Sequence, residues 1–217
     1  DQQILSVQAS PVPGIYEVFT GNAVFHTDAT GSYLFVGRLI DTRTKQDLNA
    51  GRVDDLNAID FQTLPFDRAI RTVKGNGSRK LAVFTDPDCP FCQRLEQELQ
   101  SISDVTIYTF LYPLKQIHPQ AEAKSRAIWC AEDPAKAWNA WMLEKKDPGS
   151  ATCEKDPVEE LQALGKKLHI TGTPALYFEN GRRLSGALPA AQLEQLLNDP
   201  TTPREALFRP QTAQAGG

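Results

Sequence analysis

Two cysteines three positions apart, Cys89 and Cys92, stand between an apolar run and an amphipathic run. The run before them, KLAVFTD, has the length and the apolar, β-branched character of a buried strand. In the run after them, apolar residues recur at helical spacing at Phe91, Leu95, Leu99 and Ile102. A strand that leads through CxxC into a helix predicts an α/β unit with both thiols where the two elements meet.

The position of the two thiols predicts a division of labour between them. If the helix begins at Pro90, whose missing N–H costs nothing there, Cys89 caps the helix. The unpaired amides and the dipole of the helix then favour a negative sulfur and lower the pKa of Cys89. Cys92 lies one turn further on and is more buried. We therefore expect Cys89 to attack a disulfide and Cys92 to resolve the mixed disulfide.

Two other uses of the thiols fit the sequence less well. A zinc site takes four ligands, and the chain offers one CxxC plus scattered candidates in separate segments, namely Cys130, Cys153 and His118. A purely structural Cys89–Cys92 bridge would close too small a loop to gain much stability. Redox chemistry is favoured, and no metal and no cofactor beyond the thiols is expected.

The remaining pattern predicts two domains. Residues before about Gly51 are rich in β-formers broken by turns, with strands expected at Ile15–Phe19, Ala23–Thr27 and Tyr33–Ile40. The predicted organisation is an N-terminal β domain at 1–52, a linker with a short helix at 53–72, a catalytic α/β domain at 73–198 and a disordered polar tail at 199–217.

The catalytic domain is expected to continue as a second strand, helices and a hairpin. The strand is VTIYTFLYP, and Pro119, Pro134 and Pro157 can each open a helix. Asn180-Gly181 predicts the turn of a β-hairpin, and PAAQLEQLLN a closing helix. Thr173-Pro174 precedes the first strand of that hairpin and is a candidate cis peptide beside a redox CxxC.

Charge and composition narrow the function and the compartment. The 217 residues carry a formal charge of −4, without the clustered basic residues that nucleic acid binding needs. No apolar run approaches the length of a membrane span. The chain begins at Asp1 and its one methionine is Met142, so we expect a processed chain from which a secretory signal was removed. Four cysteines fit an oxidising compartment.

Several of these segments together resemble one family. FTDPDCPFC, AIWCAEDPAKAW, the later Cys153 and ITGTPA are similar to the DsbC/DsbG family of periplasmic disulfide isomerases, within the thioredoxin superfamily. The resemblance runs through the second domain to about Asn198 and more weakly through VPGIYEV. The AIWCA segment with its downstream cysteine points to the DsbC branch. The fold implied is a thioredoxin-like domain with a helical insertion, preceded by a small, mostly antiparallel α+β dimerisation domain and a linker helix.

The resemblance also implies roles for residues and partners. Cys89 would be the nucleophile and Cys92 the resolving thiol, while Thr173 and a cis Pro174 would hold a substrate strand. Cys130 and Cys153 would form a structural disulfide. Partners would be misoxidised or unfolded secreted proteins, a DsbD-type membrane reductase and a second copy of the chain.

The sequence departs from the family at the active site. The central dipeptide is Pro90-Phe91, where the DsbC branch has Gly-Tyr, and this dipeptide tunes the reduction potential. Thioredoxin keeps a buried acid six positions before its first active-site cysteine, and this chain has Val83 there. Another proton acceptor is implied, such as water or the substrate, and the sequence does not identify it. The three histidines, His26, His118 and His169, are expected to lie on the surface or in the core rather than act as bases.

The predicted function is a periplasmic, homodimeric thiol–disulfide isomerase and reductase with chaperone-like client binding. Two alternatives remain open at this point. One is a dithiol oxidase that works with the CxxC oxidised. The other is a DsbG-like holdase or single-thiol protector, for which Cys92 matters less.

Overall fold

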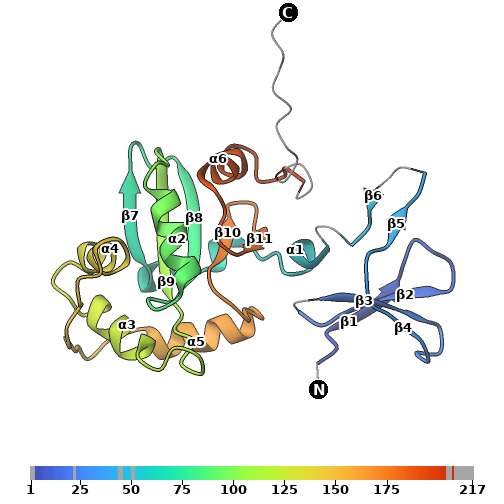
Figure 1. The fold of residues 1–217 in the computed structure, drawn as a ribbon, viewed down its shortest axis with the longest axis horizontal. Helices are drawn as coiled ribbons and strands as arrows, with labels where there is room; N and C mark the ends of the chain where they lie inside the picture. Colours follow the sequence, from blue (N-terminus) through green and yellow to red (C-terminus); the bar gives the residue numbers. More distant parts are fainter. Residues whose placement is uncertain (1–2, 22, 44–45, 50–51, 204–206, 208–217) are drawn as a thin grey trace, which may run out of the picture. The chain divides into compact units, whose positions relative to one another are not determined.

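The computed structural model in Figure 1 describes residues 3–21, 23–43, 46–49, 52–203 and 207. The chain divides into two compact units, the larger formed by residues 57–200 and the smaller by residues 1–56 together with those from 201 onward. Within the described residues, no helix combines the length and the apolar character needed to cross a bilayer.

The smaller unit is built on an antiparallel sheet of four strands in the order β1-β2-β3-β4. A second, two-stranded sheet and a short helix follow along the chain. The bounds are β1 Ser6–Ala9, β2 Ile15–Phe19, β3 Val24–Asp28, β4 Leu34–Phe35, β5 Ile40–Asp41, β6 Gln46–Asp47 and α1 Arg52–Leu56.

A buried ion pair ties α1 to this sheet. Glu17 of β2 is only 7% exposed, and its carboxylate accepts hydrogen bonds from the guanidinium of Arg52 at 2.8 and 3.1 Å. Gln8 of β1 donates to the same carboxylate at 2.5 Å. Hydrogen bonding from Arg52 lowers the pKa of Glu17, against the opposing effect of burial. The helix at the end of this unit is therefore held by charge as well as by packing.

The strand predicted at Tyr33–Ile40 is wrong in its extent. The chain pairs with β3 only at Leu34 and Phe35 and reaches the next strand at Ile40. At Gly37 the backbone has a φ of 154°, and Leu39 bonds instead to the side chain of Asn49. β-Forming residues indicate extended backbone, but they do not show where a partner strand ends. Strand β1 was missed because its four residues are all exposed and only one is a strong β-former.

The larger unit contains a mixed sheet of five strands in the order β11-β10-β8-β9-β7, in which only β8 and β9 are parallel. In Figure 1 the helix α2 lies across this sheet. The bounds are η1 Phe61–Thr63, η2 Phe66–Arg68, β7 Ile70–Lys74, β8 Arg79–Thr85, α2 Pro90–Leu99, β9 Val105–Leu111, α3 Ala121–Trp129, α4 Pro134–Glu144, α5 Val158–Lys167, β10 Ala175–Phe178, β11 Arg183–Ser185 and α6 Ala190–Asn198.

Burial of the central strand β8 on both faces explains its continuous apolar sequence. Every residue from Leu81 to Phe84 in β8 is fully buried, as expected for a parallel strand covered on both faces. The β8–α2–β9 crossover that the sequence predicts is confirmed. The edge strand β7 was missed, because its alternating residues Ile70–Lys74 fell at the end of the predicted linker.

Local signals placed the helix starts and the hairpin well. Pro90 and Pro134 each open a helix at its first turn. The predicted β10–β11 hairpin is confirmed, with Gly181 in its turn at a φ of +83°. An added Cβ at Gly181 would lie 1.7 Å from the carbonyl oxygen of Ile59, so only glycine allows this close approach.

The predicted linker overlaps the larger unit, and most of the predicted tail lies outside the described residues. Of the predicted linker at 53–72, residues 57–72 belong to the larger unit and contain η1, η2 and the start of β7. The predicted disordered tail falls largely on 204–206 and 208–217, which lie outside the described residues. The domain limits themselves remain a prediction.

The packing of α5 gives a first prediction. Gly165 in α5 faces Tyr112, and an added Cβ would lie 2.3 Å from its ring. The ring cannot move freely, because it is 5% exposed and its hydroxyl donates to the carbonyl of Ile170 at 3.1 Å. We expect Gly165→Ala to lower the free energy of unfolding by about 1–3 kcal/mol through overpacking, as measured by urea denaturation. Gly172→Ala is the matched control, since a Cβ there meets nothing within 4 Å; equal losses in both variants would contradict the packing argument.

Candidate active site

The end of β8 and the start of α2 place Cys89 at a helix N-terminus. After Thr85 the chain turns through residues 86–88, and Cys89 is the N-cap residue, with extended backbone angles and Pro90 next in the helix. Cys89 is buried, with 5% of the residue exposed. The free amides of the first turn are therefore directed to the region of its sulfur.

The pKa of Cys89 is lowered from its ordinary value of 9.0 to about 5. Hydrogen bonding from Cys92 is the largest cause, burial acts in the opposite direction, and hydrogen bonds from Thr173 and from the amides of Phe91 and Cys92 lower the pKa further. Cys89 is thus a thiolate at neutral pH, which is the reactive form of the group.

Cys92 has the opposite character. It is fully buried, and burial raises its pKa above 9.0, with a further increase from its hydrogen bond with Cys89. Hydrogen bonds from the amide of Asp86 and from Thr85 act in the other direction without reversing the shift. One helical turn therefore separates an ionised thiol from a protonated one. That difference is what a nucleophile and a resolving thiol require.

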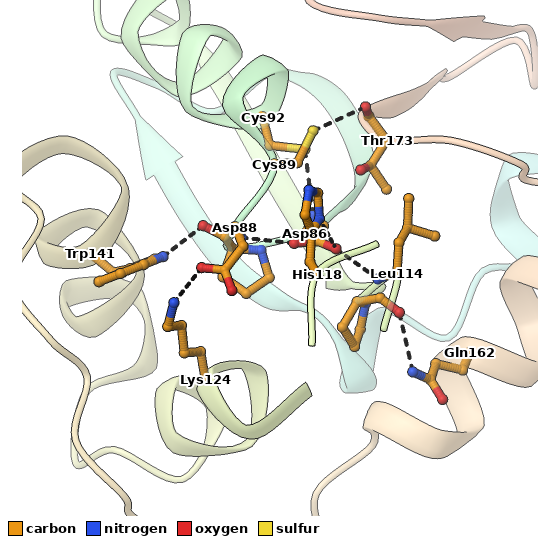
Figure 2. A network of polar contacts seen from close by, with 12 residues as sticks. Asp86, Asp88, Cys89, Cys92, Leu114, His118, Lys124, Trp141, Gln162 and Thr173 are labelled. Carbon is orange, nitrogen blue, oxygen red and sulfur yellow. Dashed lines mark hydrogen bonds and ion pairs between the residues drawn. The ribbon is translucent and has the colours of Figure 1, made fainter. Parts of the chain in front are cut away.

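The segment before β10 closes the site on the other side. The Thr173–Pro174 peptide bond is cis in the structure. The Sγ of Cys89 lies 3.4 Å from the carbonyl oxygen of Thr173, as Figure 2 shows. Pro90 and Phe91 are both exposed, Phe91 to 61%. The structure thus brings Cys89, Cys92, the dipeptide between them and the Thr173–Pro174 segment together.

The apolar face predicted for α2 needs one correction. Phe91 was placed on the same face as Leu95 and Leu99, but it is exposed. The buried face of the helix is instead formed by Cys92, Leu95, Glu96 and Leu99. Phe91 directly precedes the fully buried Cys92 in the first turn, so its side chain points to a different face of the helix, which is exposed.

Side chains from the helical insertion hold the turn that precedes the CxxC. The indole nitrogen of Trp141 in α4 donates to the carbonyl oxygen of Pro87 at 2.7 Å. Lys124 in α3 pairs with Asp88 and lies 4.3 Å from the centre of the Trp141 ring. These contacts, drawn in Figure 2, fix the backbone just before Cys89.

Asp86, at the start of this turn, is fully buried. Its Oδ1 accepts from the amide of Asp88 at 2.7 Å, and its Oδ2 accepts from the amide of Leu114 at 2.6 Å. The Nδ1 of His118 lies 3.0 Å from the same Oδ2. The backbone amide of Asp86 donates to Cys92 Sγ at 3.5 Å. The sequence did not single out Asp86, and it treated His118 as a surface or core residue; their pairing across 32 positions left no local signal.

The other two cysteines form a disulfide away from the site. Cys130, the C-cap residue of α3, is bonded to Cys153, with 5.5 Å between their Cα atoms. This bond lies within the insertion that contacts the active-site turn. Among the described residues, no group of three or more His, Cys, Asp or Glu side chains is arranged to hold a metal.

A second buried carboxyl group lies further along α2. Glu96 is 5% exposed and accepts a hydrogen bond from the indole of Trp138 at 2.9 Å. Burial raises its pKa from 4.5 to about 7, opposed by the hydrogen bond from Trp138 and the charge of Lys74. A cavity of about 50 Å³ adjoins this cluster.

A parallel β–α–β unit with CxxC at the helix N-terminus, two thiols of opposite character and a cis proline beside them define a thioredoxin-fold dithiol oxidoreductase. The comparisons with known proteins agree with this class. The profile of the thioredoxin-like domain matches residues 66–200, and that of the disulfide bond isomerase protein N-terminal domain matches residues 1–50.

Individual relatives narrow the class to a family. The probable thiol:disulfide interchange protein DsbC of Bordetella avium is 45% identical over 197 residues, which are 91% of this chain and 70% of the relative. DsbC of Escherichia coli strain K12 is 26% identical over 198 residues, 89% of this chain and 80% of the relative. A solved disulfide interchange protein from Neisseria gonorrhoeae is 47% identical, with a TM-score of 0.60 over 62% of this chain and 96% of that one. The chain belongs to the DsbC family of thiol:disulfide interchange proteins, which confirms the predicted family and fold class.

The thiol pKa gives a second prediction. We expect alkylation of the reduced chain by iodoacetamide to occur at Cys89, with a rate that is half-maximal near pH 5, because only the thiolate reacts. Mass spectrometry after timed quenching from about pH 4 to about pH 8 assigns the site and the rate. Cys89→Ser should abolish the fast phase. A half-maximal rate close to the ordinary thiol pKa would contradict the stabilisation described above.

The buried glutamate gives a third prediction. At low pH Glu96 is protonated in the folded and the unfolded chain, so it has no effect. As pH rises from 4.5 to about 7 the unfolded chain loses this proton first, and folding stability falls. We expect Glu96→Gln to remove this loss. The difference in the free energy of unfolding between the variant and the unchanged chain should therefore grow, in favour of the variant, by up to about 3 kcal/mol from acid pH to pH above 7.

Urea denaturation followed by tryptophan fluorescence measures this effect, because all three tryptophans lie in the larger unit. The exposed Glu132→Gln is the control for the change in net charge. A pH-independent difference between the Glu96→Gln variant and the unchanged chain would contradict the prediction.

Proposed function

We propose that this chain is a thiol–disulfide isomerase and reductase that reshuffles non-native disulfides in secreted proteins through its CPFC dithiol. The observation that carries the proposal is the opposite character of the two thiols, with a pKa of about 5 for Cys89 and a raised pKa for Cys92. A stable thiolate attacks client disulfides readily and also leaves readily, so mixed disulfides form and reverse. Reversal lets a client exchange its disulfide pairing until it reaches a stable set of disulfides.

The reaction has two exits. The thiolate of Cys89 attacks one sulfur of a client disulfide, forms a mixed disulfide and releases the other sulfur as a thiolate. Either a second client thiolate attacks the mixed disulfide and restores Cys89, which completes an isomerisation, or Cys92 attacks Cys89 and the client leaves reduced. The second exit leaves the CxxC oxidised. A DsbD-type membrane reductase would return it to the dithiol form.

Client binding is proposed at the surface around Cys89. Phe91 offers an exposed apolar side chain beside the sulfur, and Thr173 and Pro174 form the opposite wall. An extended client segment could lie along this wall with its disulfide at Cys89. Cys130 and Cys153 would act only structurally, by holding the insertion that contacts the active-site turn.

The smaller unit is proposed to form a homodimer and to contribute to holding unfolded clients. It exposes an unusual number of large apolar side chains along β4 and the residues after it. A cavity of about 280 Å³, lined mainly by apolar side chains, lies beside them. The exposed set from this segment is Tyr33, Leu34, Phe35, Val36 and Ile40. The family to which the chain belongs supports a periplasmic location. The family and this exposed apolar surface together support a dimer.

Two other functions remain as alternatives. A dithiol oxidase would rest with the Cys89–Cys92 bond formed, and a holdase or single-thiol protector would bind clients without needing Cys92. Pro90-Phe91, in place of the Gly-Tyr of the DsbC branch, bears on this balance because the dipeptide tunes the reduction potential. Cys92→Ala separates the alternatives: reduction of clients is lost in that variant, while binding and single-thiol exchange remain.

The proposed activity is tested by reactivation of a scrambled, fully oxidised protein with catalytic amounts of the pre-reduced chain. We expect the chain to restore activity and Cys89→Ser to restore none, because the thiolate of Cys89 begins every exchange. Cys92→Ala should retain part of the reactivation. If the unchanged chain restores no activity, the isomerase proposal fails and the oxidase or holdase becomes the better description.

A further inference from the structure

The resolving step requires a proton to leave a buried thiol. Cys92 is fully buried and its raised pKa keeps it protonated at neutral pH. It must nevertheless lose its proton before it can attack Cys89, because the thiolate is the nucleophile. Val83, six positions before Cys89, is apolar and cannot accept the proton. The acceptor is therefore water, the leaving client sulfur or a protein group near Cys92.

The contacts of Cys92 favour the thiolate once it forms. The amide of Asp86 donates to Cys92 Sγ at 3.5 Å, and hydrogen bonding from Thr85 also lowers the pKa of Cys92. Both residues lie at the end of β8. Hydrogen bonds to the charged form stabilise it inside a protein interior, where water is excluded. The negative sulfur thus has two donors, and only the acceptor of its proton is missing.

The residue whose amide donates to Cys92 Sγ, Asp86, also carries a titratable carboxyl group. Because the amide that touches the sulfur and the carboxyl group belong to one residue, the carboxyl carbon is three bonds from the contacting nitrogen. The carboxyl group is itself fully buried, and Oδ2 lies 3.0 Å from the Nδ1 of His118. The side chain of His118 is 20% exposed, against 0% for Asp86. The pair therefore joins a buried carboxyl group near the thiol to a partly exposed imidazole; Figure 2 shows Asp86 and His118 beside the two cysteines.

We propose that Asp86 accepts the proton of Cys92 in the resolving step and that His118 acts through Asp86 by connecting it to solvent. The Sγ of Cys92 forms a bond with the Sγ of Cys89, and the bond from Cys89 to the client sulfur breaks. The two active-site cysteines are oxidised, the client sulfur leaves with the electron pair and is reduced, and the proton passes from Cys92 to Asp86. No other oxidant is needed, since the mixed disulfide is the oxidant. The inference rests on the proposed function.

The other charged groups near the site are less suited to this role. Glu96 lies one turn after Cys92 on the same helix face, but its carboxyl group accepts from the indole of Trp138 and lies near Lys74. Asp88 is paired with Lys124. Among the described residues, the backbone hydrogen bond to the sulfur of Cys92 comes from the amide of Asp86 and from neither of these two residues. Glu96→Gln is therefore the matched control for Asp86→Asn, because both exchange a buried carboxyl group for an amide of the same shape.

The test measures the two chemical steps separately with glutathione disulfide as the substrate. The reduced chain is mixed with glutathione disulfide, quenched with acid at increasing times and analysed by mass spectrometry. Formation of the Cys89–glutathione adduct reports the attack of Cys89, and decay of that adduct to the Cys89–Cys92 disulfide reports the resolving step. Cys92→Ala, which accumulates the adduct, calibrates the assay.

We expect Asp86→Asn to slow the decay of the adduct by about 100-fold at neutral pH, the typical scale of acid–base catalysis, while adduct formation changes by less than about threefold. The decay should also become steeply dependent on pH, approaching a tenfold rise per pH unit, because hydroxide then removes the proton. Glu96→Gln should leave both steps unchanged. A purely structural effect of Asp86 would alter the rate without producing this pH profile.

His118→Ala keeps the inference testable if Asp86→Asn does not fold. We expect about a tenfold slower decay that added imidazole partly restores, since imidazole can replace the missing ring. If the Cys89–glutathione adduct decays at an unchanged rate in Asp86→Asn, the inference is overturned. If Asp86→Asn does not fold, an unchanged rate in His118→Ala overturns it. Slower decay in Glu96→Gln alone assigns the role to Glu96 instead. If the unchanged chain forms no adduct, the proposed function fails and this inference fails with it.

Discussion

The active site depends on a difference in environment across one helical turn. Cys89 caps α2, where hydrogen bonds from Cys92, Thr173 and two free amides stabilise its thiolate, whereas Cys92 lies fully inside the core. The thiols are chemically identical, so their different environments in the fold account for their opposite pKa shifts. Strand β8 and helix α2 meet at this point, and the core packs the helix face that carries Cys92.

The helical insertion supports this arrangement from the side. Its helices α3 and α4 supply Lys124 and Trp141 to the turn before Cys89, and the segment leading into α3 supplies His118. Each of the three residues of that turn is thereby held by a side chain from the insertion. The Cys130–Cys153 bond closes the insertion on itself, so the contacts come from a covalently restrained element. The insertion thus contributes to the site although it supplies neither thiol.

The two units differ in how many apolar side chains they bury and how many they expose. The larger unit buries an extensive aromatic and aliphatic core and presents its chemistry at one helix end. The smaller unit buries little beyond β2 and β3 and instead exposes apolar side chains. Unpartnered apolar surface on this scale is what a dimer or an unfolded client would cover. In the proposed function, the first surface would carry out disulfide exchange and the second would bind clients or a second copy of the chain.

The sequence by itself determined the strand–CxxC–helix unit, the helix starts at Pro90 and Pro134 and the Asn180-Gly181 hairpin. These are decided by neighbours within a few residues, so local pattern was enough. Only the tertiary structure decided that Tyr33–Ile40 divides, that β7 joins the sheet edge and that Phe91 faces outward. It also decided that Asp86 meets His118 beside Cys92. Those outcomes depend on groups brought together from distant positions by sheet pairing and by the insertion, and no local pattern records such contacts.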